Sequence, residues 1–408
     1  MQLTNKRALT IAFVAFGLTA AACGSSSSGG TTPPAGTSSS PAASPAASSP
    51  AAINITANSF TGDFSAMAQL APLAAAGKGS VGVILPDTTS SARYAEFDAP
   101  YLTKAFEAAG LTKSQISIKN AQGSDSTFVT DAQAMITNGA TVLLIDPEDP
   151  GTGGRVETYA KQHGVSVIDY DRITQGSYYI SFNNVEVGKL IGSGFADCVK
   201  KWNVAKPNLI EMKGDLTDNN ATLFAQGYES VIKANSAWKV AAKPPGTWTP
   251  GTALTEFEQA YTANSGVNSA IIPNDENAAP IITYLKNHGI KPKTFPITGQ
   301  DSTLIGLQNI LSGYQCGTAY KPIYLEAQAA AAVAMFVRAG QTPPAALVNG
   351  STNNPNNHNT PMPSVLLKPE WVTTANMNAT VIKDNFVPAK QLCTSAYKAE
   401  CQAAGISG

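Results

Sequence analysis

The chain has 408 residues and a formal net charge of −1, and only 13% of its residues are charged. This length allows two domains with substantial cores. No basic block or acidic tail occurs along the chain, so we expect neither a nucleic-acid partner nor a cationic one.

Residues 1–22 have the organisation of an export signal. A short basic stretch precedes an apolar run from Ala8 to Ala22, which is too short to span a bilayer comfortably. The segment resembles a bacterial lipoprotein signal, in which cleavage before a cysteine leaves the thiol to carry a lipid. Ala20 stands where leucine is usual. We therefore expect lipidation at Cys23 and anchoring to the outer face of the cell membrane. The alternative is an ordinary secretory leader with an incidental cysteine.

Residues 23–77 connect this leader to the folded body. From Gly24 to about Ala52 the chain consists of Ser, Gly, Thr, Pro and Ala without one charge, so we expect a disordered tether. As a flexible coil it would span on the order of 30 Å. The Ala-rich segment from Asn54 to Ala76 predicts a short helix packed on the first lobe.

The next part of the chain alternates short apolar runs with helical patterns. The run Val81–Pro86 is short and rich in branched residues, as buried parallel strands are. The predicted order is strand 81–86, helix 94–109, strand 116–119, helix 125–138, strand 142–146, a helix ending at 163, and strand 165–170. This alternation predicts a doubly wound parallel sheet with right-handed crossovers.

A strand at 178–183 follows the previous strand after only a short polar link, and a second series of the same kind begins after it. This series consists of helix 185–200, strand 208–212, helix 220–234, strand 240–242, helix 253–263, strand 270–274, helix 278–288 and strands 295–299 and 317–320. The predicted fold class is therefore α/β, with two doubly wound parallel-sheet lobes joined by a multi-strand hinge. We expect residues 78–183 and 322–363 in lobe 1, and residues 184–321 and 364–408 in lobe 2.

Several predicted strands end in hydrogen-bonding side chains. These ends are Asp171 with Arg172, Asp218 to Asn220, Asn274, Asp301 and Lys321. Because ligands bind outside the carboxyl ends of the strands in open α/β sheets, the ends predict the walls of one polar site. Such a site suits a small, neutral, hydroxyl-rich ligand. Asp275, next to Asn274, is interpreted as the cap of the following helix.

An ordered set of short motifs resembles the periplasmic sugar-binding proteins of ABC importers, specifically the D-xylose-binding group. Each motif is weak alone, but their order and spacing from about Val81 to Phe386 are specific. The matching stretches are Ala92-Arg-Tyr, Tyr170-Asp-Arg, Tyr179-Ile-Ser-Phe-Asn-Asn, Asp218-Asn-Asn-Ala, Gly299-Gln-Asp, Tyr320-Lys-Pro and Pro363-Ser-Val-Leu-Leu. This resemblance implies the type I fold of periplasmic binding proteins.

The resemblance also implies a set of ligand-binding residues. Those expected to hydrogen-bond the sugar are Arg93, Arg172, Asp218, Asn220, Asn274, Asp301 and Lys321. Trp248 corresponds to a tryptophan that stacks on the sugar ring. Tyr94 stands where the family pattern has a second tryptophan, so it keeps an aromatic face but a smaller one. Asp171 either supports the arginine beside it or touches the ligand.

This residue set suits a pyranose on chemical grounds as well. Sugar hydroxyls both donate and accept hydrogen bonds, so aspartates can accept from them while Arg, Lys and Asn donate to them. The apolar face of the ring lies well against an aromatic side chain. Opposite charges buried together offset one another, which lets a neutral ligand lie among them.

Cysteine usage agrees with export. Besides Cys23, the chain has four cysteines: Cys198, Cys316, Cys393 and Cys401. An even number of cysteines suits an oxidising compartment, where they can pair as disulfides. One pairing joins Cys393 to Cys401 and Cys198 to Cys316, but the other pairings and free thiols remain open. No CxxC spacing occurs and the histidines are scattered, so we expect no metal site. The loop at Gly151–Gly154 lacks the dinucleotide-binding spacing, and we expect no cofactor.

Together these features imply a lipid-anchored, extracytoplasmic receptor that captures a monosaccharide, D-xylose first, and delivers it to an ABC permease. Hinge closure of the two lobes is the expected mechanism. We expect a monomer that meets the membrane only through its anchor, and no enzymatic activity. One alternative is a receptor for another aldose, such as arabinose, ribose or glucose. The other is an exported carbohydrate-active enzyme that uses Asp218 and Asp301, which the adjacent cations disfavour because they depress a carboxyl pKa.

Overall fold

The computed structural model describes residues 53–407. The expected leader at residues 1–22, the expected lipidation site Cys23 and the expected tether as far as Ala52 lie outside the described residues. Within residues 53–407, no helix combines the length and the apolar character needed to cross a membrane.

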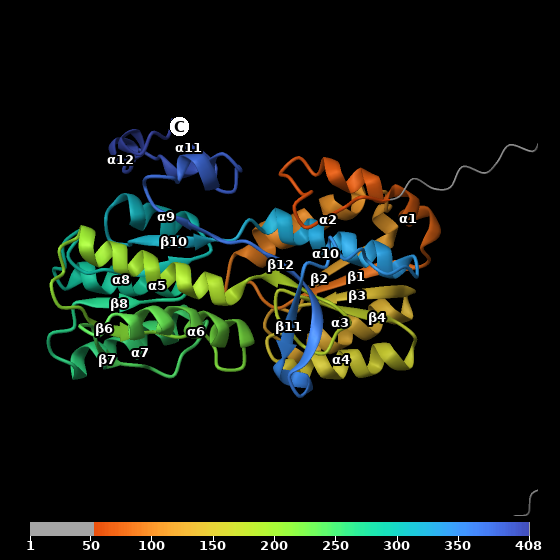
Figure 1. Ribbon diagram of the computed structural model, residues 1–408, viewed down its shortest axis with the longest axis horizontal. Helices are drawn as coiled ribbons and strands as arrows, with labels where there is room; N and C mark the ends of the chain where they lie inside the picture. Colours follow the sequence, from red (N-terminus) through yellow and green to blue (C-terminus); the bar gives the residue numbers. More distant parts are fainter. Residues whose placement is uncertain (1–52, 408) are drawn as a thin grey trace, which may run out of the picture. The chain divides into compact units, whose positions relative to one another are not determined.

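The first lobe is built on a seven-stranded sheet with the order β11-β12-β5-β4-β3-β1-β2 (Figure 1). Neighbouring strands run parallel except β11, which is antiparallel to β12. The strands are β1 (Ser80–Leu85), β2 (Ile116–Asn120), β3 (Ala140–Ile145), β4 (Ser166–Tyr170), β5 (Tyr179–Phe182), β11 (Gly350–Asn354) and β12 (Thr360–Leu367). The central strands are almost wholly buried, as apolar parallel strands between helical layers should be.

Helices cover both faces of this sheet. Helices α3 (Asp125–Thr137) and α4 (Pro150–Gln162) lie on one face, and α2 (Ala99–Ala108) and α10 (Ile323–Arg338) lie on the other (Figure 1). The central residues of α10 are alanines, whose small side chains let the helix pack closely on the strands. The predicted alternation of strands and helices in this lobe is confirmed.

The N-terminal described segment packs on the same lobe. It forms a 3₁₀ turn, η1 (Ser65–Leu70), followed by the short helix α1 (Ala71–Ala76), and both contact α10. Arg338, at the end of α10, donates hydrogen bonds to the carbonyl oxygens of Ala74 and Gly79. The prediction of a short helix on the first lobe is therefore confirmed.

The second lobe has two three-stranded sheets, β7-β6-β8 and β13-β10-β9. A single parallel bridge between Ala270 and Ile297 connects them. The strands are β6 (Asn208–Glu211), β7 (Lys239–Ala242), β8 (Ser269–Ile271), β9 (Thr298–Gln300), β10 (Gly317–Tyr320) and β13 (Glu370–Val372). The helices are α5 (Asn184–Lys201), α6 (Asn219–Ala234), α7 (Pro250–Ala263), α8 (Asp275–Asn287), α9 (Leu304–Leu311), α11 (Ala389–Leu392) and α12 (Lys398–Ala403). Helix α6 packs against α5, whereas α7 packs against α8 and α8 against α9, as expected of two helical layers joined to parallel strands by right-handed crossovers.

The chain passes between the lobes at three connections. The first joins β5 to α5, the second joins β10 to α10, and the third joins β12 to β13. The predicted boundary between residues 363 and 364 is wrong, because β12 continues to Leu367 in parallel register with β5. The extended run at 364–367 therefore completes the first sheet, and the chain crosses after it. The pairing of β12 with β11 was not predicted.

Two disulfides form within the described residues, Cys198–Cys316 and Cys393–Cys401. The first links α5 to the residue before β10, across 118 positions of the sequence. The second closes a C-terminal segment of α11 and α12. These are the two pairs that the sequence analysis considered, and they join elements of the second lobe.

Candidate functional site

A polar pocket lies where the carboxyl ends of strands from both lobes meet. Every predicted ligand-binding residue lines it. The full lining is Ser90, Ser91, Arg93, Tyr94, Asp171, Arg172, Asp218, Asn220, Phe224, Trp248, Asn274, Gln300, Asp301 and Lys321. The lining residues follow strands β1, β4, β6, β7, β8, β9 and β10, so the rule that placed the site at strand ends identified the correct edge of each sheet.

Arg93 is fixed by buried carboxylates of the first lobe. It directly precedes the π-helical turn η2 (Tyr94–Asp98), and its Nε and Nη2 donate to the two oxygens of Asp98 at 2.9 and 2.8 Å. Nη2 also donates to Glu326 of α10 at 2.6 Å, and Nη1 lies 3.2 Å from Asp171 Oδ1. Burial raises the pKa of Glu326 to about 8, against the opposing effect of Arg93. The guanidinium is therefore held in one orientation beside the pocket.

Asp171 connects this network to the pocket. It directly follows β4 and has a left-handed backbone with φ 58°, which turns its side chain toward Arg93. The Tyr94 hydroxyl donates to Asp171 Oδ2 at 3.3 Å. Burial works against the charged form, but Arg93, Lys321 and Arg172 prevail and lower the pKa of Asp171. The carboxylate is thus an ionised acceptor on the pocket wall that also supports Arg93.

Arg172 lies between two carboxylates from different lobes. Its Nε is 3.6 Å from Asp218 Oδ2 in the second lobe and 3.8 Å from Asp146 Oδ1 in the first. Asp146 is fully buried, and within the described residues neither of its oxygens has a hydrogen-bond partner. Burial, opposed by Arg172, raises the pKa of Asp146 well above its usual range. Asp146 ends a predicted strand but was assigned no role in the site; it is a buried carboxyl group that lies beside the guanidinium of Arg172.

The start of α6 presents two polar groups to the pocket. Asp218 caps this helix by accepting from the Asn220 N–H at 2.8 Å, and its other oxygen accepts from Trp248 Nε1 at 2.9 Å. Asn220 accepts from the Tyr179 hydroxyl and donates to the Asp171 carbonyl at 2.9 Å, so it contacts the first lobe. The indole of Trp248 is thereby oriented by a hydrogen bond at its edge, with the ring at the pocket.

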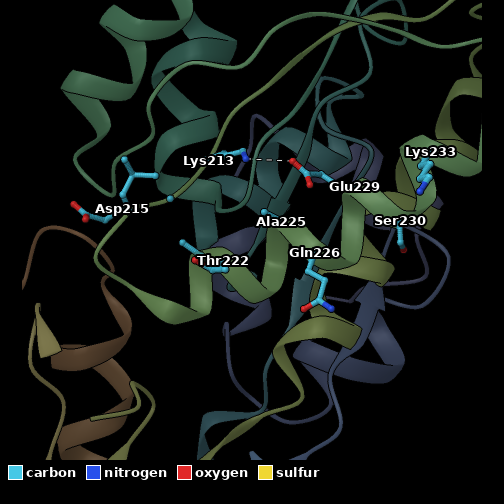
Figure 2. Close-up of a pocket in the computed structure, with 11 residues that line it drawn as sticks. Lys213, Asp215, Thr222, Ala225, Gln226, Glu229, Ser230 and Lys233 are labelled. Atoms are coloured by element: carbon cyan, nitrogen blue, oxygen red, sulfur yellow. Dashed lines mark hydrogen bonds and ion pairs between the residues drawn. The ribbon is translucent and has the colours of Figure 1, made fainter. Parts of the chain in front are cut away.

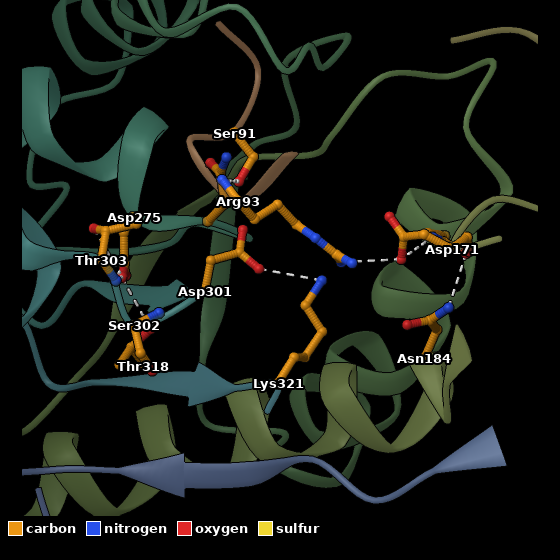
Figure 3. A network of polar contacts seen from close by, with 12 residues as sticks. Ser91, Arg93, Asp171, Asn184, Asp275, Asp301, Ser302, Thr303, Thr318 and Lys321 are labelled. Atoms are coloured by element: carbon orange, nitrogen blue, oxygen red, sulfur yellow. Dashed lines mark hydrogen bonds and ion pairs between the residues drawn. The ribbon is translucent and has the colours of Figure 1, made fainter. Parts of the chain in front are cut away.

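The remaining polar groups follow β8, β9 and β10. Asn274 caps α8 and donates weakly to the Ser90 carbonyl of the first lobe at 3.5 Å. Lys321 lies at the second connection between the lobes, with its Nζ 3.1 Å from Asp301 Oδ1 (Figure 3). Burial opposes the charge on Lys321, but Asp301 and Asp171 raise its pKa, so it is a cation in the pocket.

The sequence analysis missed four lining residues: Ser90, Ser91, Phe224 and Gln300. Phe224 resembles any core residue of an amphipathic helix, and no local signal distinguishes it. Gln300 directly precedes Asp301 in a quoted motif, so attention to the whole strand end could have found it. The interpretation of Asp275 as a helix cap is wrong, because Asn274 is the cap and Asp275 accepts from Thr303, Gln315 and Thr318 instead.

A larger cavity of about 520 Å³ lies elsewhere on the second lobe, along α6 (Figure 2). It contains none of the predicted residues, and the polar side chains that α6 contributes to it include the exposed Thr222, Gln226 and Lys233. Lys213 and Glu229 in it pair with each other at 3.2 Å. Because exposed groups are already solvated, this cavity lacks the desolvated, preorganised donors and acceptors of the strand-end pocket.

Comparisons with known proteins agree with this geometry. The family described as periplasmic binding protein domain matches residues 81–342. The D-xylose-binding periplasmic protein of Escherichia coli is 34% identical, over 68% of this chain and 83% of that protein. The multiple sugar-binding periplasmic receptor ChvE of Rhizobium radiobacter is 29% identical, over 79% of this chain and 95% of that protein. A carbohydrate transporter solute binding protein from Chloroflexus aurantiacus, solved in complex with D-glucose, is 25% identical and superimposes with a TM-score of 0.66, over 76% of this chain and 97% of that one.

Proposed function

Because the chain belongs to the periplasmic binding protein family, as a sugar-binding protein of the type I fold, we propose that its ligand is an aldopentose, D-xylose first. Its relatives and structural neighbours are solute-binding transport proteins and not enzymes. The chain is accordingly an extracytoplasmic sugar-binding protein of ABC transport. The specific sugar and the roles of individual residues are what we propose here.

The observation that carries the proposal is the set of buried, fixed donors and acceptors around the pocket. Arg93, Arg172 and Lys321 are at most 7% exposed, and each lies within 4 Å of a carboxylate that offsets its charge. A neutral polyol can bond to such groups without bringing a charge of its own into the site. Trp248 supplies the aromatic face on which a pyranose ring would stack.

Contacts between the lobes support capture by hinge closure. Asn220 of the second lobe bonds to Tyr179 and Asp171 of the first, and Arg172 pairs with Asp218. A sugar bonded to groups of both lobes would stabilise the closed arrangement relative to an open one, because only closure brings these groups together.

The test is calorimetric titration of the purified protein with D-xylose, L-arabinose, D-ribose and D-glucose. We expect D-xylose to bind with the lowest Kd, because D-glucose carries a C6 hydroxymethyl group that needs additional space, and because the 34% identical relative is a D-xylose-binding protein and not an arabinose- or ribose-binding one. Binding of another sugar at least tenfold more tightly than D-xylose would overturn the xylose assignment. Turnover of any of these sugars would contradict the receptor function.

A second candidate ligand is a hexose, and three observations favour it. One relative is a multiple sugar-binding receptor, and one structural neighbour holds D-glucose. Tyr94 also provides a smaller aromatic face than a tryptophan would, which leaves space beside the ring. In the same titration, D-glucose would then bind as tightly as D-xylose or more tightly.

We further propose that the protein acts as a monomer held at the membrane by a lipid on Cys23, and passes its sugar to an ABC permease. The support for the anchor is the lipoprotein-like sequence of residues 1–23. Replacing Cys23 by Ala should release the protein from the membrane fraction into the medium or the soluble extract. Retention of the Cys23→Ala variant on the membrane would contradict the lipid anchor.

A further inference from the structure

Asp275, the first residue of α8, is a fully buried carboxylate that does not line the pocket. Its Oδ2 accepts hydrogen bonds from the Thr303 N–H at 2.9 Å and from the Thr318 hydroxyl at 3.1 Å. Its Oδ1 accepts from the Gln315 side-chain amide at 2.7 Å. One carboxylate thereby ties the start of α9, strand β10 and the segment before β10 to the start of α8.

Two glycines leave the space that this carboxylate occupies. A Cβ on Gly299, in β9, or on Gly306, in α9, would collide with the oxygens of Asp275. Neither glycine has a positive φ, so each is required for space and not for backbone freedom. Two glycine positions are therefore matched to one buried carboxylate, which would be costly to bury without its hydrogen bonds.

The segment that Asp275 holds contains the pocket residue Asp301. Asp301 and Ser302 both have left-handed backbones, with φ of 86° and 53°. Residues other than glycine rarely adopt this conformation, and it persists only where surrounding contacts hold it. The Ser302 N–H donates at 3.1 Å to the hydroxyl of Thr318, which itself donates to Asp275. Asp275 thus holds Thr303 directly and Ser302 through Thr318 (Figure 3).

We propose that Asp275 is a positioning residue for sugar binding, which holds the left-handed turn at Asp301–Ser302 so that the Asp301 carboxylate faces the pocket. The inference rests on the proposed function. Asp301 lies 3.1 Å from Lys321, and this pair provides an anion and a cation at one wall of the pocket. If the turn relaxed, the carboxylate would have to be ordered again when the sugar binds, and affinity would fall by that cost.

The experiment is a double-mutant cycle on sugar affinity. Asp275→Asn keeps the shape but replaces one acceptor oxygen by a donor, so we expect the Kd for D-xylose to rise about tenfold. In an Asp301→Ala background the same change should alter Kd less than about twofold, because the group that Asp275 positions is gone. Folding of each variant is checked by thermal melting. D-glucose replaces D-xylose as the probe if it is the tighter ligand of the wild-type protein.

A matched control exists in the first lobe. Asp169 is also fully buried, and it accepts from the N–H and hydroxyl of Thr174 and from the Gly176 N–H, where a Cβ would collide with it. Its partners Thr174 and Gly176 do not line the sugar pocket, whereas Asp171 and Arg172, earlier in the same link between β4 and β5, do. Asp169→Asn should lower the melting temperature but raise Kd much less than Asp275→Asn does, because the residues that it holds do not touch the pocket.

Thr318→Val serves as a second variant if Asp275→Asn does not fold. Valine removes the hydroxyl that accepts from Ser302, so Kd should again rise, by about tenfold. An unchanged Kd in a folded Asp275→Asn or Thr318→Val variant would overturn the inference. It would also be overturned if Asp275→Asn raised Kd by the same factor in the wild-type and Asp301→Ala backgrounds. Failure of the wild-type protein to bind either sugar would instead contradict the proposed function, and the inference with it.

Discussion

The two lobes hold their pocket groups in different ways. In the first lobe, Arg93 and Arg172 are fixed by buried ion pairs with Asp98, Glu326 and Asp146. In the second lobe, the polar groups are fixed by backbone geometry: Asp218 and Asn274 cap helices, and Asp301 is in a left-handed turn. Charges are thus oriented by opposite charges on one side of the ligand and by helix starts and turns on the other.

The lobes also differ in how their sheets are stabilised. The first has one continuous ladder of seven strands, whereas the second has two three-stranded pieces connected by one bridge. Both disulfides of the described residues lie in elements of the second lobe. The comparison indicates that cross-links there replace part of the cohesion that a continuous sheet supplies in the first lobe.

The largest expected effect comes from removing the longer cross-link. Replacing Cys198 and Cys316 together by Ala should lower the free energy of unfolding by about 5 kcal/mol, because the bond closes a loop of 118 residues. The second lobe should then unfold before the first, as two transitions in urea denaturation. The matched control replaces Cys393 and Cys401, which close a loop of 8 residues, and should cost about 2.5 kcal/mol. Equal losses in the two variants would contradict this view of the second lobe.

The next prediction tests how much the ion-pair network around Arg93 stabilises the first lobe. Arg93→Met leaves Asp98, Glu326 and Asp171 without their cation, and should destabilise the protein by about 3–5 kcal/mol and abolish sugar binding. Chemical denaturation and calorimetry would measure the two losses. Arg155→Met is the control, since Arg155 is 57% exposed and 4.0 Å from Asp125, and it should change stability by less than about 1 kcal/mol. A stable Arg93→Met variant would show that the network does not hold this lobe together.

A smaller change in stability is expected with pH, and it arises from one buried carboxyl group in each lobe. Burial first, and then Glu157, raises the pKa of Asp169 to about 8; burial raises the pKa of Asp275 to about 7. A carboxyl whose folded pKa lies above its unfolded pKa binds its proton more tightly in the folded state. The stability that these two groups contribute is therefore fully present below about pH 4 and is lost as the pH rises to 7 and 8.

We expect the free energy of unfolding to decrease by on the order of 2 kcal/mol between pH 6 and pH 7. The Asp169→Asn variant should show a shallower decrease, because its amide does not ionise. Urea denaturation at a series of pH values measures both slopes. A wild-type stability that rises over this range, or an identical slope in the variant, would be the contradicting result.

Much of the fold and of the site could be predicted because short sequence patterns indicate them. Apolar runs that end in Asp, Asn, Arg or Lys indicate both a strand and its carboxyl end, so the sequence alone predicts that Asp171, Asp218 and Asp301 lie at one site, and all three line the pocket. The resemblance added Arg93 and Trp248, which no strand end indicates. The groups that support the pocket were harder to predict, because their contacts are made only in three dimensions.

Glu326 illustrates the difficulty. It is one acidic residue in an Ala-rich helix, and only the packing of α10 on the sheet brings it within 2.6 Å of Arg93. The same holds for Asp275, whose partners come from three later segments of the chain. The wrong boundary at residue 363 has a similar cause, since an extended apolar run does not indicate which of two sheets it joins.

The central claim is that the pocket between the strand ends binds an aldose, with Trp248 stacked on its ring. The most direct measurement is calorimetric titration of D-xylose into the wild-type protein, Trp248→Ala and Trp238→Ala. Trp238 is a matched control, because it is partly buried against Phe195, with ring centroids 5.2 Å apart, and does not line the pocket. We predict that Trp248→Ala weakens binding by about tenfold to a hundredfold while Trp238→Ala leaves Kd unchanged. Equal affinities in all three proteins would contradict the account.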